Sequence, residues 1–568
     1  DFGLFLLANL PYILTQFTIF YPSASNMSYV HGPTSVPLLS LTVGQSLQAT
    51  VNKWPDRDAV VFLQDGVRKS FYQFQHEVNH LAAGLLALGL QKGNMLGIWG
   101  PNTYEWILFQ FATAKAGIIM VSLNPAYKVS ELTFALRKVQ CNAVVCPTQF
   151  KSQRFYDMLR QICPELNTAV SGSIRSASLP DLRNVIVTDG KESGMLNVDD
   201  VMQAAESRHH QQLDRLEGIL SPEDPINIQF TSGTTGNPKG VTLSHHNIVN
   251  NAYFIGLRMG YNWRVICVPV PLYHCFGSVL SGMCMAVHGI TLVFPSTAYD
   301  GQANLEAIEK EKCTVIYGTP TMYIDLLNQH FGNNDLSSLE TGKTHTHKHI
   351  EIHVCMIIKK ILSMLSKYQV AYGTTENSPI TFLGFPLDEL KRKTDSVGYI
   401  MDHTEAKVVD SLSGQLLPLG QPGELLIRGY CVMQGYWDEP DRTQESISED
   451  GWYKTGDIAS LDQYGYCRIE GRMKDVINRG GEKIFPAEVE QFLHKHPKVK
   501  DVQVVGVKDD RLGEQHCTVE EIKAYCKDQI SYFKIPHYVM FIESYPLTAS
   551  GKIQKNKLRA EMENSLGL

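Results

Sequence analysis

The chain lacks the excess of positive charge that nucleic-acid-binding proteins usually carry. Its 568 residues include 51 lysines and arginines against 58 aspartates and glutamates, which gives a net charge of −7. A polyanionic partner would therefore need a local basic site. On this ground we expect no nucleic-acid partner.

Closely spaced cysteine pairs are also missing. The 12 cysteines are scattered along the sequence and include no Cys-x-x-Cys pair. Such spacing in a long chain indicates reduced thiols in an intracellular compartment rather than a disulfide framework. Most of these cysteines are expected in the core.

No apolar run is long and uninterrupted enough to predict a stable membrane span. The stretch Phe2 to Tyr21 is largely apolar, but Pro11 and polar residues interrupt it and no basic flank precedes it. It is a poor signal peptide and a marginal span, and no Arg-rich transit peptide is visible. Residues 1–36 are an atypical apolar segment, and Asp1 indicates that the start is missing or has been processed.

What the sequence does contain is a hydroxyl- and glycine-rich run, Phe230 to Gly240, with a single lysine. Glycines let backbone N–H groups turn inward around an anion, hydroxyls add donors, and Lys239 adds a mobile cation. The lysine follows proline and precedes glycine, so this is not a Walker loop. An ordinary surface loop is the plainer alternative. The apolar run Ile226 to Phe230 and the later Ser244 to Asn247 frame the loop between a strand and a capped helix, which favours polyphosphate binding.

Strand and helix patterns alternate along most of the chain, which predicts an α/β fold with layered sheets and helices. We assign residues 37–470 to a large multi-subdomain N-terminal domain and residues 471–568 to a small, mobile α+β domain. A helix is expected from Phe71, and residues 95–102 are expected to form a strand that ends in a turn. Further strands are expected at 143–146, 185–188, 265–270, 291–294, 314–317, 423–429, 466–470 and 502–507.

Four further segments carry chemistry. Tyr372 to Asn377 places hydroxyls and one carboxylate on a glycine turn, which suits a metal-bound phosphate. Tyr453 to Asp457 and Gly471 to Asp475 offer a carboxylate for ribose hydroxyls and an arginine for phosphate or ribose. Lys552 sits on a glycine-flanked tail.

Together and in this order, these runs resemble the adenylate-forming superfamily of acyl-CoA synthetases, luciferases and peptide-synthetase adenylation domains. The resemblance covers about Pro37 to Leu568, and Pro271 to Gly277 and Leu547 to Gln554 look most like mitochondrial medium-chain acyl-CoA ligases. It implies that a fatty acid and ATP form acyl-AMP and pyrophosphate, after which CoA displaces AMP. It also implies Mg²⁺ and a location in the mitochondrial matrix.

The resemblance further implies roles for individual residues. Thr235, Glu376 and Lys552 would be catalytic, Glu376 would contact the metal, Lys474 would be the hinge of the small domain, and His274 would line the acyl pocket. The residues implied in ATP binding are Thr231, Ser232, Gly233, Thr234, Thr235, Gly236, Asn237, Pro238, Lys239, Tyr372, Gly373, Thr374, Thr375, Asp457, Arg472 and Lys552.

Simpler roles stay open for several of these residues. A lysine near a terminus is usually a solvated charge, and only the Ser-Gly-Lys-Ile context of Lys552 argues otherwise. Asp457 and Glu376 could cap turns. His274 could equally be a core histidine with its hydrogen bonds satisfied.

Two segments depart from the family pattern. In residues 335–367 the expected glycine-rich turn is replaced by a tract in which His345, His347 and His349 alternate. A zinc site is one hypothesis, and a segment altered by an alternative or misassigned transcript is the favoured one. In residues 515–518 the chain passes almost directly into a helix from Thr518 to Ile530, so a family strand is missing and a sheet edge would be exposed.

These departures leave a second function open, a catalytically impaired adenylate-fold protein that binds ATP or an acyl ligand. Luciferase-like or peptide-synthetase activity is a third possibility, although no carrier-protein domain is present. The sequence predicts neither the acyl chain length nor the oligomeric state, because pocket walls come from distant segments.

Overall fold

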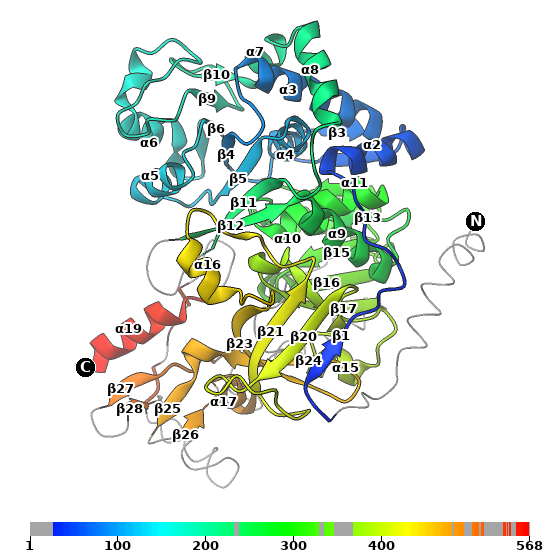
Figure 1. Cartoon of the computed structure of the whole chain (residues 1–568), viewed down its shortest axis with the longest axis vertical. Helices are drawn as coiled ribbons and strands as arrows, with labels where there is room; N and C mark the ends of the chain where they lie inside the picture. The colour runs from blue at the N-terminus through cyan, green and yellow to red at the C-terminus, as the bar shows by residue number, and fades with distance from the viewer. Residues whose placement is uncertain are drawn as a thin grey trace.

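The protein is described by a computed structural model. Residues with a described structure are 26–231, 238–328, 334–345, 367–479, 482–484, 486–493, 502–509, 513–515, 538–540, 542, 545–546 and 553–566. Figure 1 shows two large α/β layers stacked along the long axis, with a smaller sheet and helix α19 at the opposite end from α7 and α8.

The first large sheet has eight strands in the order β10-β9-β6-β4-β5-β11-β12-β22. The six strands from β10 to β11 pair in parallel, whereas β12 and β22 add an antiparallel edge. Their bounds are β10 Leu196–Asn197, β9 Asn184–Val187, β6 Ala143–Cys146, β4 Met95–Trp99, β5 Ile119–Leu123, β11 Pro225–Thr231, β12 Lys239–Ser244 and β22 Gly435–Tyr436.

The second large sheet has nine strands in the order β19-β18-β17-β16-β15-β13-β14-β2-β3. Its central strands are parallel and both edges are antiparallel. The bounds are β19 Tyr399–Ile400, β18 Ile380–Leu383, β17 Lys367–Gly373, β16 Thr341–His345, β15 Val315–Gly318, β13 Val265–Cys267, β14 Thr291–Phe294, β2 Asp58–Phe62 and β3 Val67–Ser70.

Two smaller antiparallel sheets follow. Five strands in the order β1-β20-β21-β23-β24 form one sheet, and four in the order β26-β25-β28-β27 form the other; β7 and β8 pair separately. The bounds are β1 Tyr29–His31, β20 Thr404–Val409, β21 Gly423–Gly429, β23 Tyr453–Leu461, β24 Cys467–Arg472, β25 Ile477–Arg479, β26 Glu482–Ile484, β27 Val507–Asp509, β28 Gly513–Gln515, β7 Gln149–Phe150 and β8 Gln153–Arg154.

Buried helices fill the space between the two large sheets. Apolar residues of α2, α3, α4, α9 and α11 form one core with residues of both sheets. Helices α5 and α6 cover the other face of the eight-stranded sheet, whereas α12, α13 and the five-stranded sheet cover the nine-stranded one. The helices that build these layers are α2 Val43–Lys53, α3 Phe71–Ala87, α4 Tyr104–Ala116, α5 Val129–Lys138, α6 Phe155–Ile162, α9 His245–Met259, α11 Cys284–His288, α12 Gly301–Glu311 and α13 Pro320–Asn328.

The remaining helices are short connections or lie at the surface. They are α7 Val198–Gln203, α8 Ser207–Glu217, α10 Cys275–Gly277, α15 Leu390–Asp395, α16 Pro440–Ser446, α17 Pro486–Leu493 and α19 Lys555–Leu566, with single turns or π-helical segments η1 Pro164–Asn167, η2 Ser278–Met283, η3 Thr375–Asn377 and η4 Met473–Asp475. Among the described residues, no helix is both long enough and apolar enough to span a membrane.

Most predicted strands are confirmed, because runs of β-branched residues in the interior pair as expected. The prediction at 502–507 is wrong: residues 502–506 lie outside any ladder, and the strand is β27, which begins at Val507. The predicted strand at 265–270 ends early, at Cys267. Within the altered segment, residues 341–345 form β16 between β15 and β17.

Parts of the other predictions lie outside the described residues. These parts are the tract from 346 to 366, with His347 and His349, and the helix expected from Thr518 to Ile530. The proposed boundary near residue 471 stays a prediction, since β24 still belongs to the five-stranded sheet and β25 to the four-stranded one.

Helix α9 is tied to the nine-stranded sheet by a buried ion pair. Arg258 donates from Nη2 to Asp402 Oδ2 at 3.0 Å, and these side chains are 0% and 2% exposed. Arg258 also donates to the carbonyls of Leu383, Tyr399 and Ile400. The backbone acceptors offset part of the desolvation cost of the guanidinium.

We expect Asp402→Ala to lower the free energy of unfolding by about 3–5 kcal/mol, since it leaves the Arg258 charge buried without its carboxylate. Urea denaturation measures this loss. Asp157→Ala is the control, because the Arg154–Asp157 pair is 71% and 51% exposed and should contribute less than about 1 kcal/mol. Equal losses in the two variants would contradict the account.

Candidate active site

The predicted phosphate loop connects two strands of a hairpin. Strand β11 pairs antiparallel with β12, with Thr231 opposite Lys239. The loop residues Ser232, Gly233, Thr234, Thr235, Gly236 and Asn237 lie outside the described residues. The sequence predicted a strand and then a capped helix; a second strand intervenes because residues 239–244 pair with β11 and β22.

The capped helix itself is confirmed. Helix α9 begins at His245 after Ser244, whose hydroxyl accepts from the Asn247 N–H while the Asn247 side chain accepts from the Ser244 N–H. This reciprocal capping satisfies N–H groups that the first turn would otherwise leave unpaired. The helix therefore begins directly after the return strand of the phosphate loop.

Tyr436 connects Lys239 with Glu376. The Lys239 Nζ lies 4.6 Å from the centroid of the Tyr436 ring, and the Tyr436 hydroxyl donates to Glu376 Oε1 at 3.1 Å. Burial and then the Glu376 charge raise the pKa of Tyr436 well above its ordinary value, which keeps the hydroxyl protonated as a donor. Glu376 is partly exposed, and because its carboxylate accepts from another strand, it does more than cap its own turn.

The turn that carries Glu376 follows strand β17. Gly373 is tightly enclosed, since a Cβ there would lie 1.7 Å from the Pro379 carbonyl oxygen. Thr374 and Thr375 are buried; the Thr374 hydroxyl accepts from the Asn377 amide, and Thr375 Oγ1 lies 3.8 Å from Cys275 Sγ. The turn is therefore fixed by side-chain contacts on both flanks.

Asp457 and Arg472 form a cross-strand pair. They are opposite each other on β23 and β24, and Arg472 Nε lies 3.2 Å from Asp457 Oδ1. Asp457 Oδ2 accepts from the Tyr372 hydroxyl at 2.6 Å, which connects this sheet to β17. Burial and then the Asp457 charge raise the pKa of Tyr372 far above its ordinary value. Asp457 lies within a strand, so the turn-capping alternative does not describe it.

A cavity opens beside this pair. It measures about 310 Å³ and is lined by Thr455, Gly456, Arg472, Met473 and Lys474. Burial disfavours the Arg472 charge, but the nearby Asp457 and Tyr372 oxygens raise its pKa overall. Lys474 behaves oppositely, because burial and then the Arg472 charge lower its pKa. The cavity therefore offers one cation paired with Asp457 and one amine whose pKa is lowered.

His274 lies next to the Glu376 turn. It is partly buried and precedes α10, and its Nδ1 accepts from the Phe276 N–H at 3.1 Å. Its neighbour Cys275 contacts Thr375, so the predicted acyl-pocket histidine and the Glu376 turn are brought together. Whether His274 contacts an acyl chain stays a prediction.

Sequence reasoning missed Tyr436, although an aromatic pair directly after Gly435 was a visible signal. Lys552 lies outside the described residues, so its position relative to this site stays a prediction. Within the described part of the chain, no three His, Cys, Asp or Glu side chains are placed to hold a metal ion by themselves.

The chain matches known proteins along most of its length. The family model described as AMP-binding enzyme matches residues 47–437, and the AMP-binding enzyme C-terminal domain matches residues 488–552. The chain is 60% identical over 560 residues to "Medium-chain acyl-CoA ligase ACSF2, mitochondrial" of Danio rerio and 52% identical over 568 residues to the protein of the same name from Rattus norvegicus. In each case the match covers 95% of this chain and 91% of the relative.

A solved structure supports the fold alone. The anthranilate CoA ligase AuaEII in complex with anthranoyl-AMP superposes with a TM-score of 0.79 at 24% identity, covering 94% of this chain and 99% of that one. The predicted superfamily and the predicted fold class, a large α/β domain with a small C-terminal domain, are both confirmed.

We expect the Lys474 amine to react faster with acetic anhydride at mildly alkaline pH than the amine of Lys557 on helix α19 does; both side chains are exposed. Its lowered pKa leaves more of the amine uncharged at a given pH. Competitive labelling followed by mass spectrometry measures the rate. Arg472→Gln removes a neighbouring positive charge, so labelling of Lys474 should slow; faster labelling would contradict the assignment.

Proposed function

Since the chain belongs to the AMP-binding enzyme family, we propose that it is a medium-chain acyl-CoA ligase that forms acyl-AMP and then acyl-CoA. Identity of 50–60% to ligases of this name over nearly the whole chain bears out the activity predicted from the sequence. The roles of individual residues, and the order in which they act, are our proposal.

The observation that carries the proposal is the contact series Lys239, Tyr436, Glu376 at the base of the phosphate loop. One rigid aromatic side chain thus contacts a cation over its ring and a carboxylate at its hydroxyl. The cation suits phosphate oxygens and the carboxylate suits a metal bound to them. The Asp457–Arg472 pair beside the cavity supplies groups for the nucleoside part of ATP.

The chemical difficulty of the first step is charge. The fatty-acid carboxylate must attack the α-phosphorus of ATP, form a C–O–P linkage and expel pyrophosphate, so an anion approaches a polyanion. Lys239, Arg472 and Lys552 would offset that repulsion, and fixed cations lower the barrier because they need no reorganisation. In the second step the CoA sulfur attacks the acyl carbon and AMP leaves. No covalent enzyme intermediate is required.

The residues present fit Mg²⁺. This ion is usually bound through one or two carboxylates together with substrate phosphates rather than by an all-protein cage. Glu376 is a partly exposed carboxylate beside the phosphate loop and would be its protein ligand. When bound, Mg²⁺ would neutralise charge on the phosphate oxygens.

Further assignments follow from the family. Lys474, on the segment joining β24 to β25, would be the hinge about which the small domain turns between the two steps. His274 and its neighbours would line the acyl site. The two reported relatives are named as mitochondrial, and we propose a matrix location for this chain.

We expect Glu376→Gln to slow pyrophosphate release by about a hundredfold at saturating ATP, because the carboxylate charge that holds the metal is lost. The Mg²⁺ concentration for half-maximal rate should rise as well. Steady-state assays with a medium-chain acid measure both quantities. The exposed Glu389 provides the control, as Glu389→Gln; an unchanged Mg²⁺ requirement in Glu376→Gln would contradict the metal role.

We expect Lys552→Ala to abolish adenylate formation while leaving ATP affinity nearly unchanged, since its proposed contacts matter mainly in the transition state. Acid-dependent exchange of pyrophosphate into ATP measures the first quantity, and calorimetry the second. Lys557→Ala on the same tail is the control. A loss of ATP affinity equal to the loss of rate would contradict the role and leave Lys552 as a binding residue.

A further inference from the structure

Residues 430–437, here called the bridge segment, join the two halves of the phosphate site through the main chain. The Met433 N–H donates to the Glu376 carbonyl at 2.8 Å. The Gln434 and Trp437 N–H groups donate to the carbonyls of Thr242 and Gly240 on β12, at 3.0 and 2.7 Å. One short segment therefore contacts both the Glu376 turn and the return strand of the phosphate loop.

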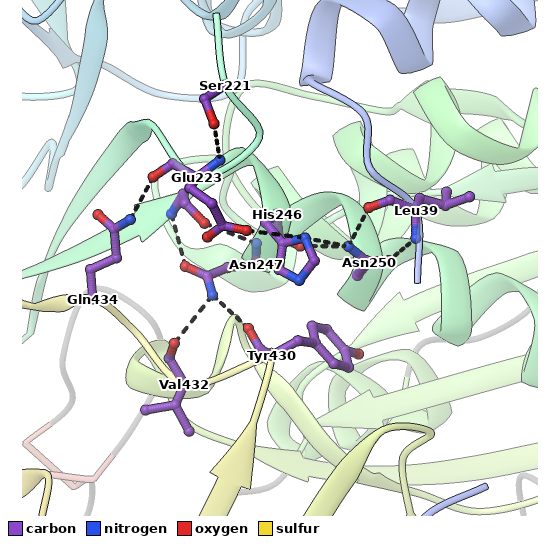
Figure 2. A network of polar contacts seen from close by, with 10 residues as sticks. Leu39, Ser221, Glu223, His246, Asn247, Asn250, Tyr430, Val432 and Gln434 are labelled. Carbon is purple, nitrogen blue, oxygen red and sulfur yellow. Dashed lines mark hydrogen bonds and ion pairs between the residues drawn. The ribbon is translucent and has the colours of Figure 1, made fainter. Parts of the chain in front are cut away.

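Side chains hold the start of the bridge segment from two sides. Asn247 Nδ2 donates to the Tyr430 carbonyl at 2.5 Å and to the Val432 carbonyl at 3.1 Å, as Figure 2 shows. The intervening Cys431 carbonyl accepts from Ser378 Oγ at 2.6 Å, just beyond the Glu376 turn. Three successive carbonyls are thus held in place, alternately by α9 and by the turn.

The Asn247 amide can adopt only one orientation. Its Oδ1 accepts from the Ser244 N–H at 2.8 Å, so its Nδ2 must face the bridge carbonyls. The side chain is buried, with 5% exposure. An amide supplies both an acceptor and two donors at this point, whereas a carboxylate or hydroxyl cannot.

A second polar connection joins Gln434, in the middle of the bridge segment, to Glu223 and His246. Gln434 Nε2 donates to the Glu223 carbonyl at 2.6 Å, and the Glu223 carboxylate lies 3.6 Å from His246 Nδ1 (Figure 2). The bridge segment is therefore tied to the first turn of α9 and to the residues before β11. The Gln434–Glu223 tie is a directional hydrogen bond, which sets position more sharply than apolar packing, whereas the Glu223–His246 contact is a longer approach of a carboxylate to an imidazole.

We infer that Asn247 is a positioning residue for acyl-adenylate formation: it fixes the bridge segment and, through Tyr436, the spacing between Lys239 and Glu376. The inference rests on the proposed roles of those two residues. Among the described residues, the hydrogen bonds of Asn247 go to Ser244 and to the carbonyls of Tyr430 and Val432, so it acts through the bridge segment.

The decisive variant is Asn247→Asp, which is isosteric. Its carboxylate still accepts from the Ser244 N–H and suits a helix N-terminus, so the cap is kept. It cannot donate to the carbonyls of Tyr430 and Val432. We expect kcat for acid-dependent pyrophosphate release to fall about tenfold to a hundredfold, with the KM for the fatty acid unchanged. Asn247→Ala should lose kcat similarly, which provides a second variant if Asn247→Asp does not fold.

Asn250 supplies a matched control on the same helix. It is fully buried, and its amide bonds the Leu39 backbone and the carbonyl and ring of His246, but neither of the bridge carbonyls that Asn247 holds. Asn250→Asp and Asn250→Ala should lower the melting temperature but keep kcat. Equal losses of kcat in the Asn247 and Asn250 series would show a purely structural role and overturn the inference.

A double variant separates this inference from the proposed function. In the Glu376→Gln background, Asn247→Ala should cost little further rate, because both changes act on one unit. Fully additive losses would overturn the positioning role. If Asn247 variants keep kcat while Glu376→Gln loses it, the inference fails and the proposed function stands. If Glu376→Gln keeps kcat, the proposed role of Glu376 itself fails.

Discussion

The bonding of the bridge segment to both β12 and the Glu376 turn is the constraint on which the site depends. The phosphate-loop strands belong to the eight-stranded sheet, the Glu376 turn follows β17 of the nine-stranded sheet, and Asp457 belongs to the five-stranded sheet. Among the described residues these sheets are separate ladders, so no ladder joins β12 directly to β17 and aligns Lys239 with Glu376. Main-chain bonds of residues 430–437 supply that alignment, and the Tyr372–Asp457 bond connects the third sheet.

Helix α9 makes polar contacts both with the bridge segment and with the nine-stranded sheet. Near its start Asn247 bonds the bridge segment, and near its end Arg258 bonds the nine-stranded sheet and Asp402. Its apolar residues lie in the core between the two large sheets. The polar contacts fix position while burial supplies most of the free energy, because a net hydrogen bond contributes only about 1 kcal/mol. The proposed phosphate site is therefore built on a buried helix rather than on loops alone.

The sequence predicted those strands and helix ends that a local residue pattern determines. Buried β-branched runs such as Val144 to Cys146 and Thr291 to Phe294 identified strands, and the Ser244 cap identified the start of α9. It could not predict β12, because that strand is recognised only through its partners β11 and β22, nor the Tyr372–Asp457 bond between two sheets. Tyr436 was missed for the same reason: its importance comes from contacts across 60 residues to Glu376 and nearly 200 to Lys239. The positions of Thr235 and Lys552 stay predictions from family motifs.

The central claim is that this chain activates medium-chain fatty acids, and pyrophosphate release from the purified protein tests it most directly. The assay would use MgATP with a series of fatty acids of increasing length, with and without CoA, alongside nucleotide-binding and folding controls. The account predicts release that depends on the acid, peaks at medium chain lengths and turns over continuously once CoA is present. A folded protein that binds ATP but releases no pyrophosphate with any acid would contradict it and identify an impaired, ligand-binding member of the family.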